Sequence, residues 1–135
     1  MHLKTALDSN FLKSLNIMMS MPLPATSAYW LSKANKKIQK EIRDFHEVRI
    51  KTLKKYAFTN EAGDFTTSKG EPILDGGAAV FKSDADKDAW DKEYQTLVEI
   101  ELDIKKISVS SLGVDTKIEP TLLSAVDELF TDDAN

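Results

Sequence analysis

The longest regular pattern of apolar positions lies between about 26 and 56 and has the period of an α-helix. Most steps along this stripe are of three or four residues, which places the side chains on one helix face. The stripe contains Leu31, Ile38, Ile42, Phe45, Arg49, Thr52 and Tyr56. Thr26 or Ser27 is the expected N-cap, and Ile50 and Leu53 lie off the stripe. A helix of about 30 residues is about 45 Å long, so it must contact more than one element or project.

A second pattern, with a period of two residues, marks the segment 98–104. Its apolar residues are Val98, Ile100, Leu102 and Ile104, and charged residues alternate with them. This alternation predicts a β-strand with one buried face, which we place at the centre of a small sheet. The N-terminal segment has Leu3, Thr5 and Leu7 on one face and predicts a neighbouring strand. The Lys105–Lys106 doublet shifts the phase, so the pattern resumes at Ile107.

Three shorter helices are predicted elsewhere in the chain. Asp8 or Ser9 can cap the first, which ends before the prolines of "MPLP". Ser83 and Asp86 form an approximate capping box at the start of the second, and Pro120 suits the first turn of the third. The apolar faces contain Phe11, Leu15 and Met18 in the first helix, Trp90, Tyr94 and Leu97 in the second, and Leu122, Leu123, Val126, Leu129 and Phe130 in the third.

The segment of about 59–82 is a turn-rich connector. Bends are expected at Gly63, Gly70, Gly76 and Gly77, with short strands at 64–67 and 78–82. The chain end, 131–135, is acidic and is expected to fray. We find no internal repeat or long linker, so the 135 residues predict a single domain, 1–135.

Together these elements predict an α+β fold. One long helix, about 26–56, and three shorter helices pack on a small, mostly antiparallel sheet. The composition agrees with a soluble globular protein, because 41% of the residues are hydrophobic and 30% are charged. No apolar run reaches the about 18 residues that cross a membrane, and polar residues interrupt the N-terminal segment where a signal peptide would be apolar. The absence of cysteine excludes disulfides and zinc–thiolate sites and fits a reducing cytoplasm.

The charges are unevenly distributed along the chain. Nine of the 18 Lys and Arg residues and three of the 22 Asp and Glu residues lie between Lys33 and Lys55. This segment therefore carries +6 and the remainder −10. The candidate partner-contact residues are Lys33, Lys36, Lys37, Lys40 and Arg43. Glu41, Asp44 and Glu47 interleave with them, so we favour a solvated helix face, or contact with an acidic partner, over phosphate contacts with nucleic acid.

Arg49 is the single residue of greatest interest, because it falls inside the apolar stripe between Phe45 and Thr52. An arginine at such a position can pack its aliphatic stem while its guanidinium group meets a carboxylate. We therefore predict a buried or interface ion pair for Arg49, with the acidic helix as one source of the carboxylate. A ligand-binding role for Arg49 is the alternative.

Reactive clusters are not apparent in the sequence. "DADKDAWDKEYQ" begins like a calcium loop, but Ala89 and Gln95 replace the required glycine and bidentate glutamate. The two histidines, His2 and His46, are far apart in the sequence, and no carboxylate or second histidine stands at ligand spacing from His46. "DGGAAVFKS" lacks the ending of a phosphate-binding loop. We predict no catalytic residue, metal ligand or cofactor, and a protein that is not an enzyme.

The order of the segments resembles a family of small tailed-bacteriophage proteins of unassigned function. The resemblance runs through "MPLPATSAYWLSK", "EVRIKTLKKY", "WDKEYQTLVEIELDIKKISVSSL" and "IEPTLLSAVDELF", which cover nearly the whole chain in this order. The "GGAAVF" insert and Trp30 depart from the pattern. The resemblance implies a phage gene product and transfers no catalytic residue.

From these observations we expect a minor virion component, associated with capsid, neck or tail, that contacts other virion proteins. An intracellular protein that regulates or inhibits a host protein is the alternative, and a nucleic-acid-binding accessory is a third. The expected location is the virion, or the host cytoplasm during infection. Self-association is left open by the sequence.

Overall fold

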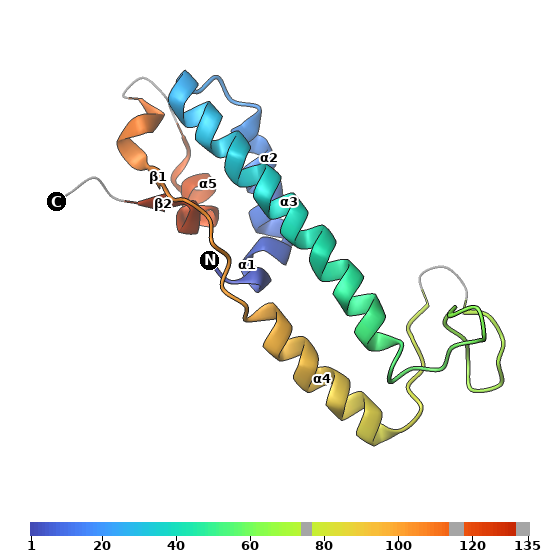
Figure 1. Ribbon diagram of the computed structural model, residues 1–135. Helices are drawn as coiled ribbons and strands as arrows, with labels where there is room; N and C mark the ends of the chain where they lie inside the picture. Colours follow the sequence, from blue (N-terminus) through green and yellow to red (C-terminus); the bar gives the residue numbers. More distant parts are fainter. Residues whose placement is uncertain (74–76, 114–117, 132–135) are drawn as a thin grey trace. The chain divides into compact units, whose positions relative to one another are not determined.

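A computed structural model describes residues 1–73, 77–113 and 118–131 of the chain. Within these residues it contains five α-helices, two short 3-10 helices and two strands (Figure 1). The chain divides into two compact units, which we call the terminal unit (Met1–Ile42 with Glu99–Asn135) and the middle unit (Arg43–Val98). The single domain stays a prediction, because this division describes contacts and not the cooperativity of folding.

The terminal unit begins with two helices, α1 (Leu3–Leu7) and α2 (Ser9–Met19). The strand predicted at the N-terminus is therefore wrong, because "LKTAL" is rich in good helix formers and the helix begins directly after the extended residue His2. The expected cap of α2 is confirmed, since the Asp8 carboxylate accepts a hydrogen bond of 2.7 Å from the Asn10 backbone N–H. This cap starts α2 directly after α1.

The predicted central strand, 98–104, is also wrong. Val98 is the last residue of α4 (Asp84–Val98), and the residues after it form no ladder. The N-terminal segment does lie beside them, through a single antiparallel bridge between His2 and Glu101. Leu3 N–H donates to the Ile100 carbonyl over 2.8 Å, and Leu102 N–H donates to the Met1 carbonyl over 2.7 Å. Pairing stops there because the partner chain leaves the extended conformation to form α1.

Two short strands form the sheet of the terminal unit, β1 (Ile107–Ser108) and β2 (Phe130–Thr131). They pair in parallel, with Ile107 opposite Phe130, so the mostly antiparallel sheet is contradicted. The connection contains η1 (Val109–Leu112), α5 (Pro120–Ala125) and η2 (Asp127–Leu129), which together return the chain in the same direction. Pro120 occupies the first turn of α5 as predicted, but the helix stops at Ala125.

Most of the apolar core belongs to the terminal unit. Its buried apolar side chains come from α1, α2, the first part of α3 (Ala25–Leu53) and the segments after Glu99. They are Leu3, Ala6, Phe11, Leu15, Met18, Leu31, Ala34, Ile38, Leu102, Ile107, Leu112, Val126, Leu129 and Phe130. Neither Thr26 nor Ser27 caps α3, because the helix begins before them. The buried Ser27 hydroxyl instead donates a hydrogen bond to the Ser111 carbonyl, which ties α3 to η1.

The long helix is confirmed as α3, although it ends three residues before the predicted Tyr56. Leu31, Ile38 and Phe45 of the predicted stripe are buried. The remaining members of the stripe are half-buried, namely Ile42, Arg49, Thr52 and Tyr56. Leu53, which the stripe left out, is buried and Ile50 is 40% exposed. The helix therefore turns a slightly different face inward near its end.

The middle unit contains the rest of α3, the connector and α4. The Ser83 hydroxyl accepts a hydrogen bond of 3.1 Å from the Asp86 backbone N–H and donates to its carboxylate, so the expected cap of α4 is confirmed. The connector forms only isolated antiparallel bridges, Ala57 with Phe81, Thr59 with Phe65 and Thr66 with Pro72, in place of the two predicted strands. Gly63 and Gly70 have the positive φ of tight turns. Gly76 and the end of the acidic tail, 132–135, lie outside the described residues.

Candidate functional site

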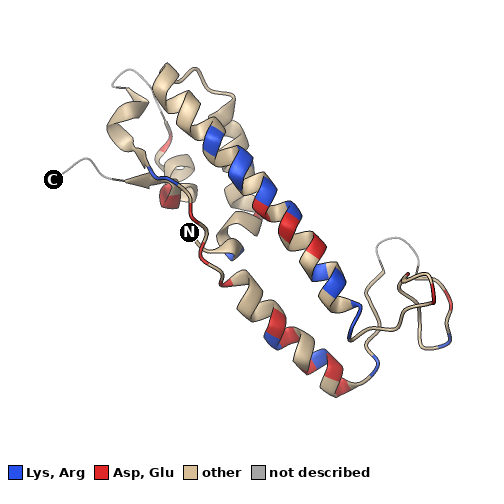
Figure 2. Ribbon diagram, in the orientation of Figure 1, with Lys and Arg blue, Asp and Glu red and all other residues tan. Residues whose placement is uncertain are grey.

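The basic residues predicted to contact a partner follow one another along α3 (Figure 2). All five are exposed, namely Lys33, Lys36, Lys37, Lys40 and Arg43. The first four belong to the terminal unit and Arg43 begins the middle unit. Within the described residues, Lys37 forms an ion pair with Asp103, and no carboxylate pairs with Lys33, Lys36 or Arg43. Lys33, Lys36 and Arg43 are thus available to the carboxylates of a partner.

A groove in the terminal unit lies beside two of these lysines. It has a volume of about 600 Å³ and combines residues of α3 with residues of the extended segment before β1. We call it the lysine–tryptophan groove, and its lining residues are Trp30, Lys33, Ala34, Lys37, Asp103, Ile104 and Lys105. Lys33, Ala34 and Lys37 follow the helical spacing that places side chains on one face of α3.

Two aromatic rings position the ammonium groups at this groove. Lys105 Nζ lies 3.7 Å from the centre of the Trp30 ring, within the range of a cation–π interaction. Lys33 Nζ lies 5.3 Å from the centre of the Tyr29 ring. The two rings meet edge to face, with their centres 5.1 Å apart. The aromatic pair therefore holds two lysine side chains that would otherwise be free to move.

The ion pair at the groove is weak. Lys37 Nζ and the Asp103 carboxylate are 3.9 Å apart, and the Asp103 side chain is fully exposed. Such an exposed pair contributes little to stability in water, so Lys37 remains available to a carboxylate from elsewhere. With three lysines and one acid, the groove is positively charged inside a protein of net charge −4.

A second hollow, of about 790 Å³, lies in the middle unit. It is mostly apolar, and we call it the Arg49 pocket because Arg49 is among its lining residues. The apolar lining includes Ile50, Leu53, Phe65, Ile73, Phe81 and Trp90. Asn60 and Asp64 are polar members of the same lining.

The structure places Arg49 as expected but does not give it the expected partner. The residue is half-buried, so its stem packs as predicted. Its Nε atom is buried and has no hydrogen-bond acceptor among the described residues. No carboxylate of these residues forms an ion pair with it. The ion pair of Arg49 therefore stays a prediction.

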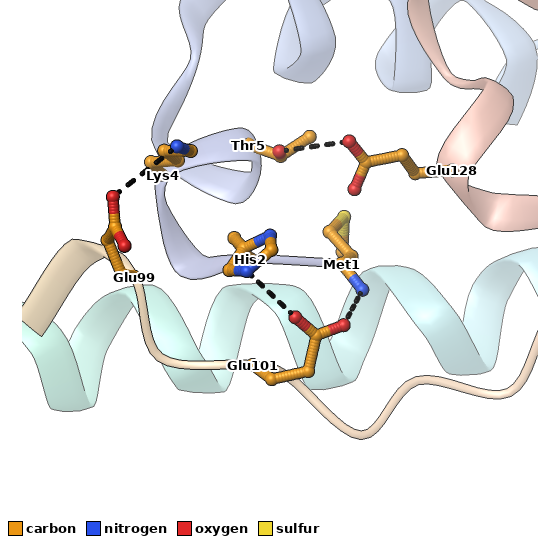
Figure 3. A network of polar contacts seen from close by, with 7 residues as sticks. All are labelled: Met1, His2, Lys4, Thr5, Glu99, Glu101 and Glu128. Carbon is orange, nitrogen blue, oxygen red and sulfur yellow. Dashed lines mark hydrogen bonds and ion pairs between the residues drawn. The ribbon is translucent and has the colours of Figure 1, made fainter.

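A polar network holds the start of the chain in the terminal unit (Figure 3). The Met1 amino group lies 2.7 Å from one oxygen of Glu101, and His2 Nε2 lies 3.2 Å from the other. The hydrogen bond from the amino group lowers the pKa of Glu101, and the charge of the nearby His2 acts in the same direction. Lys4 adds a pair with Glu99 at 3.7 Å. The network joins α1 to the segment after α4 and is structural.

Neither histidine stands in a reactive arrangement. His46 is exposed and contacts only the neighbouring Phe45 ring among the aromatic contacts of the described residues. The acids of the calcium-like sequence lie inside α4, where Asp86 contacts the cap. Across residues 1–73, 77–113 and 118–131, no group of three or more His, Asp and Glu residues could hold a metal ion. In the same ranges no helix is both long and apolar enough to cross a membrane.

Sequence reasoning found Lys33 and Lys37 but missed Trp30, Ile104 and Lys105 as parts of the same groove. Trp30 and Lys105 are far apart in the sequence, so only the tertiary fold shows that they meet. A signal was present in Tyr29 and Trp30, two adjacent aromatic residues one helical turn before a lysine. Comparisons with protein-family models, curated proteins and solved structures find no match for this chain.

Proposed function

We propose that this protein is a non-enzymatic bacteriophage protein that acts through protein–protein contacts, as a minor component of the virion attached to capsid, neck or tail. The phage setting rests on the resemblance of its ordered segments to small tailed-bacteriophage proteins. The mode of action rests on one observation, the lysine–tryptophan groove. There an aromatic pair and several lysines gather at one exposed place.

The chemistry of this surface supports a contact role. Tyr29 is 53% exposed, and an exposed tyrosine beside a tryptophan is typical of residues that anchor interfaces. The long helix supplies a stiff base, because Leu31, Ala34 and Ile38 are buried beneath the same turns. A partner that binds here meets side chains already held by the core, which reduces the entropy lost on binding.

Mass spectrometry of purified phage particles tests the proposal. We expect peptides of this protein to remain with particles that have been banded and washed at physiological salt. A high-salt wash should release part of it, because contacts made by exposed lysines are screened. Detection only in the lysate of infected cells, and never in particles, would overturn the virion proposal and favour the regulator of a host protein.

A variant pair sharpens this experiment. Lys37→Glu changes the charge of the groove, whereas Lys51→Glu makes the same change on an exposed part of α3 outside it. We expect Lys37→Glu to reduce incorporation into particles and Lys51→Glu to leave it unchanged. Equal incorporation of both variants would show that the contact lies elsewhere on the molecule.

A further inference from the structure

We propose that the lysine–tryptophan groove binds an acidic peptide segment of a partner protein, in which an apolar side chain is flanked by carboxylates. This inference rests on the proposed function, since it specifies the chemistry of the partner. Three features of the groove support it: its charge, its apolar floor and the lysine side chains that lie over its aromatic rings.

The charge of the groove requires an anionic occupant. Lys33, Lys37 and Lys105 line it from two different segments, and Asp103 is the single acid among the lining residues. Lys37 is only weakly engaged, at 3.9 Å from an exposed carboxylate. Carboxylates of a partner can therefore pair with ammonium groups that the fold has brought together.

The floor of the groove requires an apolar group on the same occupant. Trp30 and Ile104 are half-buried and offer carbon surface between the lysines, and the buried Ala34 closes the groove beneath them. The volume of about 600 Å³ lies within the range of small ligand sites, about 300–1,000 Å³, and suits a short segment. A peptide that alternates acids with an apolar residue satisfies both the charge and the floor.

The aromatic rings argue against single-stranded nucleic acid. Proteins bind single strands by stacking bases on free ring faces beside a basic track. Here Lys105 covers a face of Trp30 at 3.7 Å and Lys33 approaches a face of Tyr29 at 5.3 Å. Acids also interleave with the basic residues of α3, at Glu41, Asp44 and Glu47. The rings thus position the lysines, and the faces that Lys105 and Lys33 approach are not free for stacked bases.

Fluorescence titration tests the inference on the full-length protein. In a Trp90→Phe background, Trp30 is the one remaining tryptophan and reports on the groove directly. The probe is a short synthetic peptide that repeats Glu-Glu-Leu. We expect a saturable change in Trp30 emission, with an affinity that falls as salt rises. A Lys-Lys-Leu peptide and a short oligothymidylate serve as matched probes and should cause no saturable change.

Variants locate the binding. Lys33→Glu and Lys37→Glu should each weaken peptide binding by about fivefold to tenfold, because each replaces an attractive charge with a repulsive one. Lys51→Glu, the control on the same helix, should change the affinity by less than about twofold, since it lies outside the groove. Circular dichroism of all three variants checks that α3 remains folded.

The inference is overturned if the Glu-Glu-Leu peptide does not bind, or if Lys51→Glu weakens binding as much as Lys37→Glu. It is also overturned if oligothymidylate binds as tightly as the peptide, or if sedimentation shows that a second copy of the chain fills the groove. Failure of the proposed function looks different, because it would appear as absence from particles whatever the peptide does.

Discussion

The two units of this protein differ sharply in how much apolar surface they bury. Fourteen of the 18 buried apolar residues belong to the terminal unit and four to the middle unit, although their described parts contain 71 and 53 residues. The four are Phe45, Leu53, Ala57 and Val98. Apolar burial is the main favourable term in folding, so we expect the terminal unit to be the more stable.

The middle unit relies on other interactions. The Tyr94 ring contacts two other rings. Its centre lies 6.1 Å from that of Phe45 and 5.8 Å from that of Trp90. The connector adds isolated bridges in place of a continuous ladder. This unit should therefore open locally before the terminal unit does. The comparison teaches that the lysine–tryptophan groove lies in the well-packed unit, where its geometry is fixed before a partner arrives.

The largest expected effect on stability comes from truncating a core leucine in each unit, and it tests the difference in packing between them. Leu15→Ala removes a fully buried side chain of the terminal unit and should destabilise the protein by about 3 kcal/mol. Leu53→Ala makes the same change in the middle unit, where the side chain is 8% exposed and lines the Arg49 pocket. Its cost should be about 2 kcal/mol or less.

Urea denaturation followed by circular dichroism measures both variants. If Leu53→Ala proved as costly as Leu15→Ala, the middle unit would be better packed than its burial indicates. The comparison between the units would then fail.

A smaller effect should follow from removing one helix cap in each unit. Asp8→Ala removes the cap of α2, and Ser83→Ala removes the cap of α4. Each should cost about 1 kcal/mol, because a backbone N–H loses its acceptor. We expect Ser83→Ala to raise hydrogen exchange in α4 alone, whereas Asp8→Ala lowers the stability of the terminal unit. Exchange that spreads equally through both units after Ser83→Ala would contradict separate opening.

At acid pH the terminal unit should weaken through Glu101. Its pKa is lowered in the folded state, so its contribution is complete above the unfolded pKa of about 4.3 and is lost as pH falls through the folded value. Glu101→Gln should therefore be less stable than the parent at neutral pH and equal to it in strong acid. A stability difference that did not change with pH would exclude this ion pair as its source.

The smallest expected effect is a loss of stability of the middle unit at alkaline pH. The hydrogen bond between Glu93 and Tyr56 raises the pKa of the Tyr56 hydroxyl above its ordinary value. The protonated form is favoured by folding, so this contribution is complete below the unfolded pKa of about 10 and is lost as pH rises through the folded value. In Glu93→Gln, an ultraviolet titration should show the pKa of Tyr56 closer to that of an ordinary tyrosine. An unchanged titration would contradict the contact.

Four of the five α-helices could be predicted from the sequence because their signals are local, whereas α1 was taken for a strand. The apolar stripe located α3, Ser83 and Asp86 marked the start of α4, and Pro120 marked α5. The boundary of α3 at Leu53 was missed by three residues, since the stripe continues to Tyr56 after the helix has ended. Arg49 was correctly placed on the stripe, but its partner depends on tertiary contacts that no local pattern contains.

The strands could not be predicted in the same way. Alternation at 98–104 describes a chain that is extended, yet a strand also needs a partner, and the N-terminal segment provides a single bridge at His2. Ile100 is accordingly 47% exposed although the pattern placed it inside. The groove could not be predicted for the same reason. Trp30 and Lys105 meet only when the chain returns to α3.

Hydrogen–deuterium exchange of the full-length protein, with and without the Glu-Glu-Leu peptide, tests the central claim most directly. The account predicts that the terminal unit exchanges slowly in the absence of the peptide. On binding, added protection should appear at residues 29–37 and 103–105, and the connector at 59–82 should exchange as before. Protection confined to the middle unit, or no protection at saturating peptide, would contradict the claim that the well-packed unit presents the partner-binding groove.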